Sequence, residues 1–267
     1  MSDNIPLLIT GCIAPVKEQP WLKISNASTR LQQYIDSIKF YIDSSNFSHI
    51  VFCENSNYSY AQKGELLTYA HNKNKTLEWH SFMGNSDLVR QHGKGIGEDE
   101  IYAYAFAHSP SLKEAKTFAK VTGRLKLRNI NSLTTKNISK HNYFIRDIYR
   151  GKGKKGVDTR FFICNRFFFE QELLNCYQKS SIKENKSQPL EEVYFKLLKG
   201  RYKCLKGYPL FDGVSAGNGK EYTKEPKFQL LFFNLLAKIG LFNKFFYFIF
   251  LSMRLRFKLQ SIIDRIK

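Results

Sequence analysis

The sequence predicts an α/β fold with a mostly parallel central sheet, and three consecutive stretches near its start carry that prediction. Residues 5–13 form a short apolar run of strand length. Thr29 and Gln32 have the spacing of a capping box, which opens a helix. Residues 49–53 form a second buried strand, so the order begins a parallel sheet with a right-handed crossover. The helix has one apolar face, made of Leu31, Tyr34, Ile35, Ile38, Tyr41 and Ile42.

The composition is that of a packed globular protein with an anionic partner. Its 267 residues suit one sizeable domain with an appendage, and 43% hydrophobic residues are ample for a core. The formal net charge of +19 predicts binding to nucleic acid, acidic lipid or a phosphorylated substrate.

The cysteines and histidines do not have the spacing of metal ligands. The five cysteines include no Cys-x-x-Cys pair, and Cys12 and Cys53 lie in apolar runs, as reduced buried thiols do. The first residues lack the basic and long apolar regions of a signal peptide. We therefore expect a cytoplasmic protein without a cysteine or histidine metal site.

Polar residues follow the second strand at the edge of the sheet where ligands bind. Glu54 and Asn57 come just after the apolar run, and a carboxylate there can accept hydrogen bonds from ribose hydroxyls. The alternative interpretation is a solvated turn rich in Asn and Ser.

A glycine-rich stretch precedes a helix that we expect to start near Ile101. Gly93, Gly95 and Gly97 form this loop, and a glycine loop at a helix N-terminus can receive an anion. The spacing matches neither the dinucleotide fingerprint nor a Walker A loop. Upstream, residues 66–72 predict a helix and residues 77–82 a third strand.

The central stretch, residues 118–129, combines strand periodicity with four cations. Leu125 and Leu127 alternate with basic residues, which predicts a half-buried strand with its cations on one face. Fixed positive charge beside Gly123 suits a phosphate or pyrophosphate. The alternative is a basic edge strand protected against aggregation. The cations are Lys120, Arg124, Lys126 and Arg128.

The second half contains further loops and a helix with paired carboxylates. Residues 149–156 are basic and glycine-rich, which predicts either a lid over phosphates or a solvated loop. Residues 157–169 predict a strand that runs into a helix, and residues 208–219 predict another glycine-rich loop. Glu191 and Glu192 fall in the first turn of a helix, where the dipole favours carboxylates, so a structural role suffices for one of them.

The last forty residues predict basic amphipathic helices. Their longest apolar run, residues 245–253, is far shorter than the roughly 20 residues that span a membrane. Aromatic and basic residues together favour a helix pair lying on an anionic membrane surface. The alternative is a helix that covers the core or a dimer interface. We expect a catalytic domain at 1–225 and a membrane-association tail at 226–267.

The order of these stretches resembles the GT-A-like glycosyltransferases that build bacterial capsular and lipopolysaccharide (O-antigen) chains. The resemblance covers roughly residues 5–225 and implies a GT-A-like, Rossmann-type domain with a nucleotide-sugar site at the carboxyl edge of the sheet. The matching stretches are residues 8–12, 52–56, 93–98, 120–124, 158–162 and 213–217.

The resemblance implies a set of donor-binding residues and a chemistry for the leaving group. The Asp-x-Asp metal motif of this group is missing where Lys120 to Arg124 stand, so no cofactor is firmly implied, and a divalent metal stays open as the alternative. Arg124 and Lys126 would then neutralise the departing diphosphate in place of a divalent metal. The donor residues would be Thr10, Cys12, Glu54, Asn57, Gly95, Gly97, Lys120, Thr122, Gly123, Arg124 and Lys126, and the acceptor or phosphate loop would contain Gly213, Ser215 and Gly217.

The resemblance also implies a general base and a set of partners. Glu191 or Glu192 would deprotonate the acceptor hydroxyl, with Asp158 in reserve. The acceptor would be a glycan, lipid-linked at the inner face of the cytoplasmic membrane. Two other functions remain open, a nucleic-acid-binding protein that uses its basic surface and a non-catalytic membrane-associated scaffold.

Overall fold

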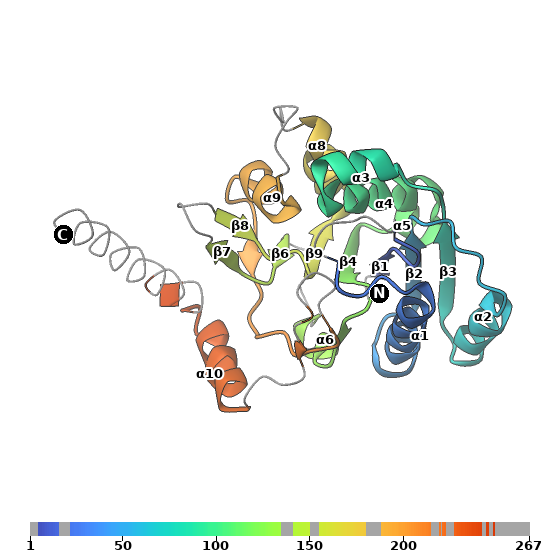
Figure 1. Ribbon diagram of the computed structural model, residues 1–267. Coiled ribbons are helices and arrows are strands. Elements are labelled where there is room, and N and C mark those ends of the chain that lie inside the picture. Colours follow the sequence, from blue (N-terminus) through green and yellow to red (C-terminus); the bar gives the residue numbers. More distant parts are fainter. Residues whose placement is uncertain are drawn as a thin grey trace, which may run out of the picture.

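A seven-stranded sheet forms the centre of the molecule in the computed structural model (Figure 1). Its strand order is β10-β6-β9-β4-β1-β2-β3, and β9 alone runs antiparallel to its two neighbours. The fold is therefore α/β with a mostly parallel central sheet, as the sequence predicts. The structure describes residues 5–15, 22–134, 141–149, 155–179, 188–214, 219, 221–222, 227–241, 244–245 and 248.

The strands of the large sheet are short and lie mostly in the first 165 residues. Two small ribbons flank them, one from β5 and β11 and one from β7 and β8. The bounds are β1 Leu7–Gly11, β2 His49–Glu54, β3 Thr76–Ser81, β4 Thr117–Thr122, β5 Lys126–Leu127, β6 Tyr143–Phe144, β7 Asp147–Tyr149, β8 Lys155–Val157, β9 Phe161–Asn165, β10 Lys203–Cys204 and β11 Phe211–Asp212.

Helices cover both faces of the sheet (Figure 1). Helices α1 and α2 lie on one face, and α3, α4, α5, α8 and α9 lie on the other. The bounds are α1 Ala27–Ser44, α2 Lys63–Asn72, α3 Ser86–His92, α4 Lys94–His108, α5 Pro110–Glu114, α6 Ile130–Leu133, α7 Arg166–Phe168, η3 Phe169–Leu173, α8 Cys176–Lys179, α9 Leu190–Leu198 and α10 Lys227–Lys238.

Each face of the sheet has its own apolar core. Along β1, Leu7 and Ile9 pack with α1 and α2, whereas Leu8 packs with α4 and α9. Successive side chains of a strand point to opposite faces, so a continuous apolar run fills both cores. This explains why polar and apolar residues do not alternate along the first strands.

Helix α1 begins three residues earlier than the capping box predicts. The Asn26 side chain accepts a hydrogen bond from the Thr29 backbone N–H at 2.9 Å and is the N-cap. Asn is a strong N-cap because its short side chain reaches the free N–H groups of the first turn. The predicted apolar face is otherwise confirmed, with Tyr34, Ile38 and Tyr41 buried.

Two predicted elements are different in the structure. The central strand stops at Thr122, a turn follows, and Lys126 and Leu127 belong to a separate ribbon, so the four cations do not share one strand face. Helix α4 starts at Lys94, which places Gly95 and Gly97 inside its first turns and not in a loop before it. Helical glycines are tolerated where close packing requires them, and both glycines are buried.

Helix α10 packs on the body through a small apolar cluster. Leu236 and Ala237 contact Tyr208 on its inner side. Among the helices that the structure describes, none is long and apolar enough to cross a membrane. Of the predicted basic tail, residues 226, 242–243, 246–247 and 249–267 lie outside the described residues.

Candidate functional site

The turn after β4 meets the end of β1 at the carboxyl edge of the sheet. The Gly123 N–H donates to the Thr10 carbonyl at 3.0 Å. A Cβ atom on Gly123 would lie 2.2 Å from that carbonyl oxygen, so only glycine allows this approach. The predicted glycine is therefore explained by the packing of two strand ends, and it fixes the position of the following Arg124.

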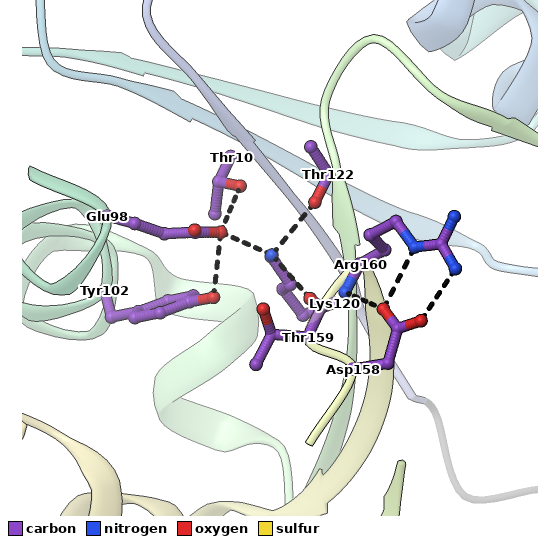
Figure 2. A network of polar contacts seen from close by, with 8 residues as sticks. All are labelled: Thr10, Glu98, Tyr102, Lys120, Thr122, Asp158, Thr159 and Arg160. Atoms are coloured by element: carbon purple, nitrogen blue, oxygen red, sulfur yellow. Dashed lines mark hydrogen bonds and ion pairs between the residues drawn. The ribbon is translucent and has the colours of Figure 1, made fainter. Parts of the chain in front are cut away.

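A buried lysine network lies directly beneath this edge (Figure 2). Lys120 is fully buried, and its Nζ forms an ion pair with Glu98 and donates to the Thr159 carbonyl at 2.9 Å. The same Glu98 oxygen accepts from Thr10 Oγ1 and from the Tyr102 hydroxyl, each at 3.2 Å. Burial alone would raise the pKa of Glu98, but the Lys120 charge together with the hydrogen bonds from Lys120 and Tyr102 lowers that pKa. Lys120 is thus neutralised by the protein.

The buried Asp158 and the half-buried Arg160 form a second ion pair beside the first (Figure 2). Arg160 donates to both carboxylate oxygens of Asp158, from Nε at 3.0 Å and from Nη2 at 2.6 Å. Burial opposes ionisation of Asp158, but the attraction of Arg160 lowers its pKa. The guanidinium also lies near the rings of Phe211 and Tyr222, at 4.8 and 5.1 Å from their centroids. The pair therefore anchors the loop around residue 211 to the site.

Two buried arginines lack a carboxylate partner in the part of the chain that the structure describes. Arg30 is 4% exposed and donates from Nε to the Cys12 carbonyl at 2.8 Å. Arg124 is 8% exposed and donates from Nη1 to the Gln33 side chain at 2.7 Å. Both guanidiniums lie 6.0 Å from the centroid of the Tyr34 ring.

The electrostatics of this arginine pair favour an added anion. Burial lowers the pKa of Arg124; Tyr34 opposes this shift in part, and the Arg30 charge adds a smaller lowering. Two like charges removed from water are costly unless an anion compensates them. Burial also raises the pKa of the neighbouring Cys12 thiol to about 11, so this cysteine stays protonated at neutral pH.

Glu54 ends β2 and connects the loops after three strands. Its carboxylate accepts from the backbone N–H groups of Ser56 and Tyr58, each at 2.8 Å, and from the Ser81 hydroxyl. It is fully buried, with its oxygens occupied by the protein. The position agrees with the sequence prediction, but the contacts are those of a structural anchor and leave little capacity for a ribose. Asn57, predicted beside it, is exposed with a left-handed φ of 49°.

The glycines of α4 lie against neighbouring side chains. A Cβ atom on Gly95 would lie 2.0 Å from the Tyr177 hydroxyl and 3.2 Å from the Leu190 backbone nitrogen. Gly97 is equally confined by Val89 and Asn55. The close contact at Gly95 brings the start of α9 next to the first turn of α4, one turn before Glu98.

The predicted bases of α9 differ in accessibility. Glu192 is 6% exposed, whereas Glu191 is half-buried and lies against Gly156. Burial raises the pKa of Tyr177, and the charges of both Glu191 and Glu98 add to that effect. Both carboxylates are therefore near enough to Tyr177 for their charges to act on it.

The remaining predicted residues are divided between the site and its surroundings. Gly213 has a φ of 120°, and a Cβ there would lie 2.7 Å from the Arg124 carbonyl, so this loop contacts the β4 turn. Lys126 lies opposite Asp212 in the register of the small ribbon, and Asp212 forms an ion pair with Arg128. Thr122 accepts from Lys120 Nζ at 3.3 Å. Ser215 and Gly217 lie outside the described residues.

Sequence reasoning missed Arg30 and Glu98. Arg30 lies on α1 next to apolar positions, and nothing local distinguishes it from a surface arginine. Glu98 belongs to an acidic triplet that the helix dipole alone could explain. Within the described ranges, no group of three His, Cys, Asp or Glu side chains is arranged to hold a metal ion.

The comparisons with known proteins show the fold. No protein-family profile and no curated protein sequence matches the chain. The solved structure of the glycosyltransferase GlyE from Streptococcus pneumoniae TIGR4 is similar with a TM-score of 0.51 at 12% identity, over 76% of this chain and 45% of GlyE. A glycosyltransferase involved in the glycosylation of the major capsid of PBCV-1 gives a TM-score of 0.42 at 10% identity, over 75% and 80% of the two chains.

The chain thus spans less than half the length of GlyE, and the likeness concerns architecture. The strand order, the single antiparallel strand and this likeness together give the protein a GT-A-like fold, similar to that of GlyE.

Proposed function

We propose that this protein is a glycosyltransferase that transfers a sugar from a nucleotide-diphosphate-sugar donor to a glycan acceptor. The observation that carries the proposal is the pair of buried arginines, Arg30 and Arg124, at the carboxyl edge of a GT-A-like sheet. The carboxyl edge of an open α/β sheet is where ligands bind. A diphosphate would supply the negative charge that the described part of the chain does not.

The arginines suit the departure of a nucleoside diphosphate. Negative charge develops on the leaving phosphate as the glycosidic bond breaks, and fixed cations lower the energy of that transition state. A guanidinium binds two phosphate oxygens at once and keeps its charge when buried. Arg124, supported by Lys126, would perform this task without a metal ion, and Lys120 would position Glu98 and Thr10 beneath it.

Glu191 is the base that we assign to the acceptor hydroxyl. It is the more accessible carboxylate of α9. Asp158 is unsuitable because Arg160 occupies both of its oxygens and lowers its pKa. A base with an accessible carboxylate fits an inverting reaction, in which the hydroxyl attacks directly. Unchanged turnover of Glu191→Gln would rule this role out.

The acceptor that we propose is a lipid-linked glycan at the inner face of the cytoplasmic membrane, as in capsule or lipopolysaccharide synthesis. Support comes from α10 and the turn after it, where Leu231, Leu235 and Ile239 are 70%, 56% and 56% exposed. Residues 226–267 contain eight basic residues and one acidic residue. Exposed apolar side chains together with cations suit an anionic lipid surface.

A nucleotide screen tests the donor site. Purified protein would be melted with UDP, GDP, CDP, CMP and their sugar conjugates, each with manganese and with EDTA. We expect one nucleotide to raise the melting temperature in EDTA as well, because a ligand that binds only the folded state stabilises it. A shift that needs manganese would contradict metal independence, and no shift with any nucleotide would contradict the donor site.

Substitution of Arg124 tests the leaving-group role. Arg124→Gln should weaken diphosphate binding at least tenfold and lower turnover by about 100-fold, because a buried charge contact to the transition state is lost. Arg128→Gln is the matched control, since Arg128 already pairs with Asp212 at 3.2 Å and is 48% exposed. Isothermal titration and a donor-turnover assay would measure both variants. Equal behaviour of the two variants would remove the assignment.

A further inference from the structure

A groove on the outer side of α4 is not explained by the donor site. It has a volume of about 660 Å³ and runs between the loop after β3, helix α4 and helix α8. Ligand pockets for small molecules and short oligomers have volumes in this range. All of the residues that line it belong to the described part of the chain.

The groove is lined by carboxylates, amides and aromatic rings. Asp99 and Glu100 contribute carboxylates, Asn85 and Gln178 contribute amides, and Tyr177 contributes a phenol. None of the described residues that line it is a lysine or an arginine, although the protein has a net charge of +19. A polyanion such as nucleic acid or an acidic lipid would meet like charge here. Groups that accept and donate hydrogen bonds beside aromatic rings instead suit a ligand rich in hydroxyl groups.

Asp99 provides an independent indication of a missing partner. It is only 5% exposed, and its Oδ2 accepts from the Tyr177 N–H at 3.4 Å. Its other oxygen, Oδ1, is buried without a hydrogen-bond partner among the described residues. An unsatisfied buried polar atom costs about 1–3 kcal/mol, so such atoms normally have a partner or await one. Asp99 lines the groove and its Oδ1 is covered in the structure, so a ligand hydroxyl would meet this oxygen once the side chain turns toward the groove.

The inner end of the groove adjoins the proposed transfer site. Tyr177 lines the groove, and its hydroxyl donates to the Gln188 carbonyl at 2.8 Å, next to the start of α9. The same hydroxyl lies against Gly95, one turn before Glu98. A chain of sugar units that ends at Tyr177 would therefore lie close to the start of α9, the helix that carries Glu191.

We infer that this groove binds a neutral oligosaccharide, the non-lipid part of the acceptor, with Asp99 Oδ1 accepting hydrogen bonds from a sugar hydroxyl pair. The inference rests on the proposed function for the identity of the ligand as an acceptor, but binding of the oligosaccharide can be measured without turnover. Neutral sugars fit because their hydroxyls satisfy the acidic and amide lining without adding charge.

Saturation-transfer NMR with two matched panels tests the inference. One panel holds neutral di- and trisaccharides, including N-acetylated ones, and the other holds uronic-acid oligosaccharides of the same lengths. Each is measured with and without a nucleoside diphosphate. We expect signals from at least one neutral oligosaccharide and weaker signals from the acidic panel. Absence of binding by every neutral member, or preference for the acidic panel, would overturn the inference.

Two variants assign the binding to the groove. Ala103 lines it from α4, so Ala103→Arg should fill the groove and weaken oligosaccharide binding at least tenfold. The matched control is Ala61→Arg in an exposed turn before α2, which should bind as the parent does. Asp99→Asn keeps the side-chain shape and should weaken binding about fivefold, because a charged acceptor is lost. Unchanged binding in both groove variants would overturn the inference.

The nucleotide melting assay on the same samples separates this inference from the proposed function. Nucleotide stabilisation without oligosaccharide binding would refute the groove alone. The opposite result is oligosaccharide binding that Ala103→Arg abolishes, without stabilisation by any nucleotide. It would support the groove as a sugar-binding site and refute the proposed glycosyltransferase function.

Discussion

At the scale of single residues, the charges that matter most differ in how they are compensated. Lys120 has Glu98 and Asp158 has Arg160, so each pair is neutral within the protein. Arg30 and Arg124 are held by a carbonyl and an amide, which accept hydrogen bonds but carry no charge. A basic residue in the sequence is therefore a site residue only when its surroundings leave its charge available.

The stability of the protein should depend on pH through Asp99. Burial raises the pKa of Asp99 to about 6, above its ordinary value of 3.8, despite hydrogen bonds from α8 that lower it. The folded state then holds a proton that the unfolded state has lost. This group's contribution is complete below pH 4 and is lost as the pH rises through 6, by up to about 3 kcal/mol.

Asp99→Asn should remove this dependence. Urea unfolding at pH 5 and pH 8 would show a smaller loss of stability in the variant than in the parent, and the variant should be the more stable of the two at pH 8. An equal loss in parent and variant would show that Asp99 has an ordinary pKa in the folded protein.

At the scale of elements, close contacts between helices decide where glycine is required. Apart from its chain neighbours and the backbone of its own helix, no described atom lies within 4 Å of the position that a Cβ on Gly64 in α2 would take. A Cβ on Gly95 in α4 would collide with Tyr177. Both substitutions remove the helix penalty of glycine, which is about 1 kcal/mol. Gly95, unlike Gly64, also allows Tyr177 of α8 and the start of α9 to approach α4 near the site.

Alanine at these two positions should therefore have opposite effects. Gly64→Ala should raise the free energy of unfolding by about 0.5–1 kcal/mol, and Gly95→Ala should lower it by about 1–3 kcal/mol, since overpacking outweighs the gain in helix propensity. Thermal and urea unfolding of both variants would measure this. Stabilisation by Gly95→Ala would mean that α4 and α8 are less tightly packed than the structure indicates.

At the scale of the whole molecule, the proposed membrane surface lies on an element of its own. The outer side of α10 exposes Leu231 and Leu235, while its inner side packs on Tyr208. The proposed division at residue 226 therefore separates the sheet domain from the segment that would contact lipid. The division and the membrane role stay predictions.

Vesicle co-sedimentation tests that surface. The protein should bind vesicles with about 30% anionic lipid and not neutral ones, and about 0.5 M salt should weaken binding because charge attraction is screened. Removal of residues 228–267, and separately Leu231→Glu with Leu235→Glu, should abolish it. Vesicle binding that both altered proteins retain would contradict the assignment of the lipid contact to α10 and the tail. RNA binding with a steep salt dependence would favour the nucleic-acid alternative.

The sequence by itself determined the order of elements and the fold class. The runs at residues 5–13 and 49–53 and the periodic face of α1 are local patterns, and each reports directly on burial. Element ends were less predictable, because Asn26 and the helical position of Gly95 depend on contacts beyond their own segment.

Only the tertiary structure decided which of the predicted charges could serve a ligand. Lys120 and Arg124 looked equivalent in the sequence, yet folding gives Lys120 a carboxylate from α4 and places Arg124 beside a second arginine from α1. Pairing and burial depend on distances between residues far apart in the chain, and the order of strands in the sheet sets those distances.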